Sequence, residues 1–451
     1  MLNNTLTKEE KQESQAKSRE ISEFIGCFLT PLLKVLDQQL DMRLVQTLYR
    51  LVLVILLHRH RQQSLILSEL GGELLGEAHA PAGSKRIGNL LHSARWKAAQ
   101  IEQELWRQGD ERVEQLNCLN DEALVIWDES ENEKPESLAA EGLCAVRSSK
   151  AARLKRIKPG FYNPPGGRPV FVPGFHWIQV LVVGLKGAPC LAHLHWWTSR
   201  GEHSSDKRSE EQALLNKLAQ WWSSRVIHVF DQGFAGAPWV QTLLQHRLLL
   251  FVLRWKKGYK LVGKDGQAKL AWKLFQGKRA IDHKEIWDAR QHCKRTVGIL
   301  FTQVTLPDDP RPLWLVTSRP GSPRKPWFLL TNIPITCAED AWHIIFIYAR
   351  RWQVEMTLRF EKCELGFESP RLQHWETRCK FLQIAALAHA FLLLLLAPHF
   401  EQLKLWLLDK WCHRNGKWSR ETPTPLYRLR LALSQLFRAF RPVYLPLLNS
   451  G

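Results

Sequence analysis

Apolar and polar positions in the first 115 residues follow the period of an α-helix. Apolar residues recur at helical spacing over 21–36 and 44–57, and a third helix is predicted over 84–108 with Ser84 as its N-cap. The pattern therefore predicts a helical N-terminal region, residues 1–120.

From residue 122 the pattern changes to short apolar runs separated by helices. Strands are expected at 123–127, 177–184, 189–197, 226–230 and 248–253, with helices at 207–222 and 238–245. This order predicts a mixed α/β sheet. Asp128 and Asp231 each follow an apolar strand, at the end where open sheets usually carry their chemistry.

Residues 254–335 break this order with Gly and Pro turns and short alternating segments, so a β-rich insertion is predicted. A long helix is expected over 338–361, and the remainder of the chain is helical. The sheet core is thus assigned to residues 121–253 and 336–365, and residues 366–451 form a helical, basic C-terminal region. The apolar runs at 51–57 and 384–397 are shorter than the roughly 20 residues of a spanning helix, so buried helices and no membrane partner are expected.

The charge of the chain indicates a polyanion as its partner. The 451 residues include 63 Lys+Arg and 44 Asp+Glu, a net charge of +19, and residues 232–354 carry 20 basic and 8 acidic side chains. Such an excess is typical of proteins that bind nucleic acid and disfavours a small-metabolite enzyme, while ribosomal and membrane-surface proteins stay open. The nine Cys form no CxxC pair and the N-terminus is charged, which favours free thiols in a reducing cytoplasm.

Two basic clusters are candidates for phosphate contacts. One lies on the predicted third helix at Lys85 and Arg86, where charge can line a groove or belong to an ordinary mixed surface. The other has six cations with no acidic residue between them: Arg147, Lys150, Arg153, Lys155, Arg156 and Lys158. A run of this kind serves either as a phosphate contact or as a solvated loop.

The predicted helix over 338–361 carries the residues with the clearest chemistry. Tyr348, Arg351, Glu355 and Lys362 fall in a stripe about 60° wide on one continuous helix. Alone, such a stripe also describes an exposed salt-bridge ladder. Together with the two strand-end aspartates, Glu355 completes three carboxylates that can hold two Mg²⁺ ions for phosphodiester chemistry.

The spacing of these four residues resembles the YREK signature of bacterial insertion-sequence transposases of the large fourth insertion-sequence family, which have a ribonuclease-H-like DDE core. The resemblance includes the strand that ends in Asp128, the segment 230–234 around Asp231, and the segment 327–332. Together these motifs span residues 123–365, over half of the chain. Gln232 departs from the family, which often has Arg at this position. The resemblance therefore does not imply a phosphate contact by this residue, whereas the metal site is unaffected.

The resemblance implies a ribonuclease-H-like mixed sheet and a role for each matching residue. Asp128, Asp231 and Glu355 correspond to the catalytic metal ligands, with Mg²⁺ as cofactor and Mn²⁺ as a substitute. Tyr348, Arg351 and Lys362 correspond to contacts with the phosphates of the transposon end. Trp327 resembles a Trp that stacks on a flipped-out base, although a core Trp in a strand fits equally well.

The sequence therefore predicts a DNA transposase that cuts and pastes its own insertion sequence. The expected partners are double-stranded DNA, as inverted-repeat ends and target, and a second copy of the chain on that DNA; the expected location is the bacterial cytoplasm, at the nucleoid. The N-terminal region is expected to recognise the ends and the C-terminal helices to contribute dimer contacts. The alternatives are a catalytically silent DNA-binding remnant and a host metal-dependent nuclease.

Overall fold

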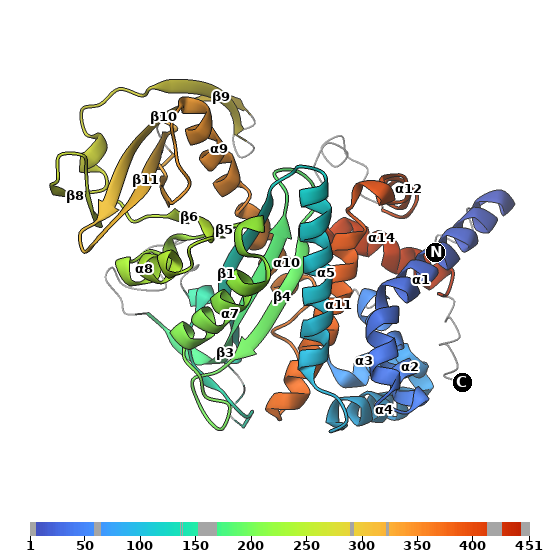
Figure 1. The fold of residues 1–451 in the computed structure, drawn as a ribbon. Coiled ribbons are helices and arrows are strands. Elements are labelled where there is room, and N and C mark those ends of the chain that lie inside the picture. The colour runs from blue at the N-terminus through green and yellow to red at the C-terminus, as the bar shows by residue number, and fades with distance from the viewer. Residues whose placement is uncertain are drawn as a thin grey trace.

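The structure is a computed structural model that describes residues 6–57, 65–135, 137, 139–151, 169–288, 293–321, 324–412 and 426–442. Figure 1 shows a β-sheet with helices packed on it in the middle of the molecule, a helical bundle on one side and a small β-rich unit on the other. The bundle combines helices from both ends of the chain. The sheet lies between this bundle and the β-rich unit.

Five α-helices precede the sheet, as the periodicity predicts in outline. They are α1 (Lys8–Asp37), α2 (Met42–Leu57), α3 (Leu67–Leu75), α4 (Ala80–His92) and α5 (Ala98–Cys118), with a 3-10 turn at Glu77–His79. A capping box begins α1: the Thr7 hydroxyl accepts from the Glu10 amide at 3.2 Å, and the Glu10 carboxylate accepts from the Thr7 amide at 3.0 Å.

The single helix predicted over 84–108 is wrong, because the chain leaves the helix after α4 and begins α5 after five intervening residues. Ser84 is not an N-cap but lies inside α4, where its hydroxyl donates to the Ala80 carbonyl at 2.9 Å. Trp96 fills the break: its ring is buried, and its indole N–H donates to the Leu90 carbonyl at 2.7 Å. Burial of this ring and its local hydrogen bond outweigh the helical pattern.

The central sheet has the strand order β4–β3–β1–β5–β6, with β2 on the outer part of β3. Its elements are β1 (Ala123–Glu133), β2 (Cys144–Arg147), β3 (Phe171–Val183), β4 (Cys190–Trp197), β5 (Val226–Phe230), β6 (Leu250–Arg254), α7 (Lys207–Trp221) and α8 (Ala237–Gln245). The pairs β4–β3 and β3–β1 are antiparallel, whereas β1–β5 and β5–β6 are parallel. The mixed α/β sheet is thus confirmed.

The β-rich insertion extends this sheet. It contains β7 (Lys260–Val262), β8 (Ala268–Leu270), β9 (Asp282–Asp288), β10 (Cys293–Leu306), β11 (Asp309–Arg319) and β12 (Phe328–Thr331). Hydrogen bonds continue from β6 to β12, β11 and β10, so the strands on either side of residue 254 belong to one sheet.

The C-terminal part is helical, as predicted. Its helices are α9 (Ala338–Ala349), α10 (Trp352–Cys363), α11 (Trp375–Leu394), α12 (Glu401–Trp411) and α14 (Leu426–Ala439). By length and composition α11 is apolar enough to span a membrane, but 89% of its most apolar window is buried inside the protein. It packs against α2, α5 and β4, as a buried helix should.

The long helix predicted over 338–361 is divided at Arg350 and Arg351. Both residues keep right-handed helical dihedrals, but the amides of Arg350 and Arg351 bond three residues back, to the carbonyls of Ile347 (3.2 Å) and Tyr348 (3.0 Å). This tighter turn rotates α10 relative to α9. The single stripe predicted for the four signature residues therefore does not run along one straight helix.

Candidate active site

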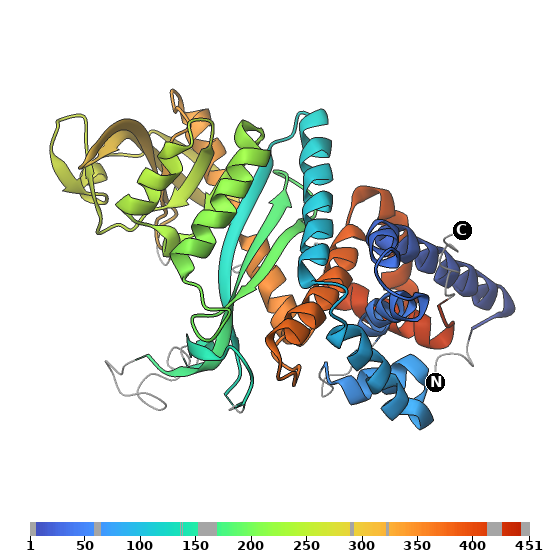
Figure 2. The ribbon, with the colours of Figure 1, turned by 60° about the horizontal axis from the view of Figure 1, so that its bottom comes forward.

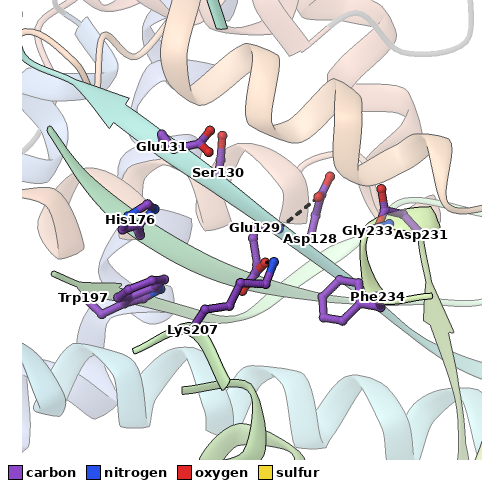
Figure 3. A pocket seen from close by; sticks show the side chains of 10 residues that line it. All are labelled: Asp128, Glu129, Ser130, Glu131, His176, Trp197, Lys207, Asp231, Gly233 and Phe234. Atoms are coloured by element: carbon purple, nitrogen blue, oxygen red, sulfur yellow. Dashed lines mark hydrogen bonds and ion pairs between the residues drawn. The ribbon is translucent and has the colours of Figure 1, made fainter. Parts of the chain in front are cut away.

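Two aspartates lie side by side where the parallel strands β1 and β5 separate. The register pairs Ala123 with Val226 through Ile126 with Val229, and Asp128 and Asp231 each lie two residues beyond the last pair. In Figure 3 their carboxyl groups turn toward the same side of the sheet. One detail of the prediction is wrong: Asp128 does not end its strand, because β1 continues to Glu133 through pairing with β3.

Asp128 has an unusually high pKa for a carboxyl group. Its pKa is raised to about 7, mainly by burial and then by the negative charge of Asp231, with a smaller contribution from Glu355. Arg351 and the Glu129 amide, which donates to Asp128 Oδ1 at 2.9 Å, oppose the shift. Three carboxylates from β1, β5 and α10 thus share one electrostatic environment.

A tight turn orients the second carboxylate. Asp231 accepts a hydrogen bond from the Gly233 amide at 2.6 Å and so caps the short 3-10 helix Gln232–Phe234. A Cβ at Gly233 would lie 2.9 Å from Asp231 Oδ1, so a side chain there would push the Asp231 carboxylate out of its position. The segment after β5 is therefore built around this aspartate.

The third carboxylate is held by an arginine on the turn between α9 and α10. Arg351 forms an ion pair with Glu355, four residues later. The Arg351 side chain is 12% exposed and that of Glu355 37%. An exposed salt-bridge ladder does not describe this pair, because the guanidinium is largely buried beside the aspartates.

Tyr348 and Trp327 pack together at the base of this turn. Tyr348 is 3% exposed, and its ring lies 5.0 Å from that of Trp327, edge to face. Burial raises the Tyr348 pKa, while Arg351 and Arg254 oppose the rise. Trp327 is partly buried, so part of its ring is used in packing against Tyr348.

Arg254 was not predicted as a site residue. Pairs between β5 and β6 end at Phe230 and Leu253, so Arg254, the last residue of β6, lies one position beyond this pairing, as Asp231 does. It lies beside the Tyr348 hydroxyl. The rule that singled out the aspartates, a polar residue at the end of a parallel strand, also applies to Arg254 and could have found it.

Lys362 and Lys150 gather around Glu368. Lys362 Nζ donates to the Glu131 carbonyl at 2.6 Å and lies 3.9 Å from the Glu368 carboxylate, and Lys150 Nζ pairs with the same carboxylate at 2.9 Å. Arg147 is exposed at the end of β2. Lys150 and Lys362, which are far apart in the sequence, thus meet at one carboxylate.

The remaining predicted DNA contacts are spread more widely. Lys85 is exposed on α4, whereas Arg86 is partly buried and donates to the Thr47 hydroxyl at 2.8 Å, which ties α4 to α2. Four residues of the basic run lie outside the described residues: Arg153, Lys155, Arg156 and Lys158.

A cavity of about 240 Å³ opens beside the two aspartates. Its lining includes Asp128, Glu129, Ser130, Glu131, His176, Trp197, Lys207, Asp231, Gly233 and Phe234. Glu129 points away from Asp128 and forms an ion pair with Lys207 at the start of α7 (Figure 3). Burial raises the pKa of Glu129 to about 7, although Lys207 opposes the shift. Glu129 and Lys207 were missed because neither residue belongs to a recognisable spacing.

The three carboxylates have the ligand chemistry that a divalent cation prefers, but their side chains are not arranged as a complete metal site. Within the described ranges, no group of three or more His, Cys, Asp or Glu side chains converges closely enough to form a metal site. Glu355 is paired with Arg351 on its own helix turn rather than with the aspartates. Hard carboxylate oxygens are the ligands that Mg²⁺ prefers, and a cation would relieve the repulsion that raises the Asp128 pKa.

Comparisons with known proteins leave the family open. No protein-family model matches the chain, and no curated protein matches it. A solved structure of a piggyBac transposase synaptic complex with hairpin DNA is similar over 94% of this chain and 79% of that chain, with 12% sequence identity and a TM-score of 0.43. A likeness of this size does not define a family for this chain.

Proposed function

We propose that the chain is a DNA transposase with a ribonuclease-H-like core, which cuts the inverted-repeat ends of its own insertion sequence and joins them to target DNA. The observation that carries the proposal is the placement of Asp128 and Asp231 at equivalent positions of two parallel strands, in one electrostatic environment with Glu355 from α10. The strand order β4–β3–β1–β5–β6, antiparallel and then parallel, supports the ribonuclease-H-like core. The net charge of +19 supports DNA as the substrate.

Asp128, Asp231 and Glu355 would hold Mg²⁺, or Mn²⁺ as a substitute. Bound there, the cation would activate a water or a 3′-hydroxyl and stabilise the leaving oxygen of a phosphodiester. Arg351, which pairs with Glu355, and Lys362, which binds the Glu131 carbonyl of β1, would supply the cations that contact DNA phosphates.

Transposition also sets the partners and the location that we propose. Two ends must be held together for joining, so the active form is a homodimer on double-stranded DNA. Such a complex works at the nucleoid in the bacterial cytoplasm. The family of insertion-sequence transposases with the YREK signature is part of the same proposal.

The test is a cleavage and strand-transfer assay on a labelled duplex that carries the inverted repeat flanking the gene, with Mg²⁺. The wild type should nick the end and join it to target DNA, and Glu355→Gln should bind the duplex equally well but cleave at least about 1,000-fold more slowly, because a neutral amide cannot replace a charged metal ligand. The matched control, Glu339→Gln, makes the same change at an exposed position on α9 and should keep wild-type activity.

Two results would contradict the proposal in different ways. Tight binding without cutting by the wild type would indicate a DNA-binding remnant that represses transposition. Cutting without joining would indicate a nuclease.

A further inference from the structure

A polar cluster formed by Gln179, Glu361 and His389 is buried next to the proposed site. Glu361 Oε1 lies 2.9 Å from His389 Nδ1, and Gln179 Nε2 donates to the same oxygen at 3.3 Å. All three side chains have no exposed surface. The cluster connects three elements, because Gln179 belongs to β3, Glu361 to α10 and His389 to α11.

This cluster is a costly way to fill a core. A buried carboxylate and imidazole lose their hydration, and well-packed apolar residues of similar volume are often as stable or more so. Three further atoms of the cluster are buried without a hydrogen-bond partner among the described residues: Gln179 Oε1, Glu361 Oε2 and His389 Nε2. Burial also raises the pKa of Glu361, against the opposing bond to His389. Stability alone gives no reason for these polar groups, whereas a requirement for a defined orientation does.

The cluster borders the carboxylate site through two elements. Gln179 is the register partner of Asp128 between β1 and β3. Glu361 is on the same twelve-residue helix as Glu355, six positions later and one before Lys362. The cluster therefore joins the strand next to the first aspartate to the helix that carries the third carboxylate.

The position of α10 needs such a connection. Its N-terminal end follows the tight turn at Arg350 and Arg351, so α9 does not hold it as a continuous straight helix would. Near its other end, His389 binds Glu361 and also stacks on Phe360, with ring centroids 5.1 Å apart. Because α11 is buried between the sheet and the helical bundle, it is a rigid support.

We propose that the cluster of Gln179, Glu361 and His389 is a positioning device that fixes the rotation of α10 and so directs Glu355 toward Asp128 and Asp231. The inference rests on the proposed function, since it assigns these buried residues to the same carboxylate site. None of the three touches the reacting atoms; they act through Glu355.

The test compares two replacements of His389. His389→Phe keeps a ring that can stack on Phe360 but removes the nitrogen that binds Glu361, whereas His389→Asn retains an amide N–H near the position of Nδ1. His389→Phe should slow single-turnover cleavage of end DNA by about 100-fold, the loss that a misplacement of roughly 1 Å produces, with an unchanged Kd for the DNA. His389→Asn should recover most of the rate.

The matched control is Thr357→Val on α10. Thr357 is also buried, but its hydroxyl donates only within the helix, to the Gln353 carbonyl at 2.9 Å. Its loss should leave cleavage within about threefold of wild type, because α10 keeps its connection to β3 and α11. Glu361→Gln is the second variant if His389→Phe does not fold; it keeps the shape and an acceptor, and should lose cleavage rate by about tenfold with an unchanged Kd.

Amide hydrogen exchange separates this inference from the proposed function. In the DNA-free protein, exchange in α10 should be faster in His389→Phe than in wild type, and should return toward wild type in His389→Asn. If the wild type cuts no DNA, the proposed function fails while exchange still reports on the connection. Unchanged exchange in α10, or wild-type cleavage by His389→Phe, would overturn the positioning role.

Discussion

At the scale of single residues, the site is defined by charges that the fold holds together at a cost. Asp128 keeps its proton up to a pH of about 7 because of burial and the neighbouring carboxylates. Glu129, the next residue, faces the opposite side and also has a pKa raised to about 7, mainly by burial. Unfavourable ionisation on both sides of one strand, beside a cavity, marks this strand as a candidate functional site.

Asp128→Asn is therefore expected to stabilise the protein in the absence of divalent cations. The unfolded carboxyl ionises near its ordinary value of 3.8, whereas the folded one ionises at about 7. Between these values the folded state binds more protons, so the free energy of unfolding of the wild type falls as the pH rises from about 4 to 7 and is level above that range. The shift sets an upper bound of about 4 kcal/mol, and solvent at the open cavity reduces the expected gain at pH 8 to about 1–2 kcal/mol.

Urea unfolding in a chelator at pH 5 and pH 8 measures this gain. It should be larger at pH 8, and added Mg²⁺ should stabilise the wild type but not Asp128→Asn. The control is Asp308→Asn, at an exposed position in the turn between β10 and β11. Equal gains at both pH values would contradict the assigned pKa.

At the scale of elements, the apolar pattern predicted where most helices and strands lie but not where several of them end. The strand Val226–Phe230 was predicted at its observed bounds. The second half of β1 was missed because 129–133 are polar, and only pairing with β3 keeps them extended. The break between α9 and α10 was missed because both turn residues keep helical dihedrals.

In the candidate site, too, the sequence predicted the residues with a local pattern and missed those that meet only in the fold. Strand ends identified Asp128 and Asp231, and spacing on α9 and α10 identified Glu355 and Arg351. No local pattern relates Lys150 to Lys362 or Gln179 to Glu361, because these pairs meet only through the packing of distant elements. Their roles required the fold.

Packing between α5 and β4 gives a prediction at this scale. A Cβ added at Gly109 would lie 2.4 Å from the Ala192 Cβ, closer than two carbon atoms can approach. Gly109→Ala should therefore lower the free energy of unfolding by about 1–3 kcal/mol, as overpacking of a tight contact does. Gly88→Ala, on α4 with nothing within 4 Å of its added Cβ, should instead raise it by about 0.5–1 kcal/mol through helix propensity. Urea unfolding of both variants is the measurement, and a loss of stability in both would contradict the packing argument.

At the scale of the whole molecule, both ends of the chain build one support for the sheet. One hydrophobic core is shared by α1, α2, α11, α14 and the sheet, while α7 and α8 cover a second core on the other face. In Figure 2 the helical bundle and the β-rich unit lie at opposite ends of the molecule. The carboxylates to which we assign catalysis lie between this bundle and the β-rich insertion, whose residues 256–279 we call the basic extension.

If the basic extension contacts DNA phosphates, DNA binding should depend on the salt concentration through its cations. Residues 256–279 carry eight Lys or Arg and one acidic residue, Asp265, which pairs with Lys269. Lys257, Lys260 and Lys273 are exposed there, beside the exposed rings of Tyr259 and Trp272. Exposed cations next to exposed rings are suited to phosphates and bases.

Replacing Lys257, Lys260 and Lys273 together with Ala should reduce the slope of log Kd against log salt concentration by about 2–3, since each lost phosphate contact removes about 0.9. Fluorescence anisotropy of a labelled end duplex at several salt concentrations measures the slope. The control removes three cations from the opposite end of the molecule, Lys404 and Lys410 on α12 and Arg438 on α14, and should change the slope by less than about 1. The same loss of slope in both variants would mean that the total charge, rather than the basic extension, determines how this chain holds DNA.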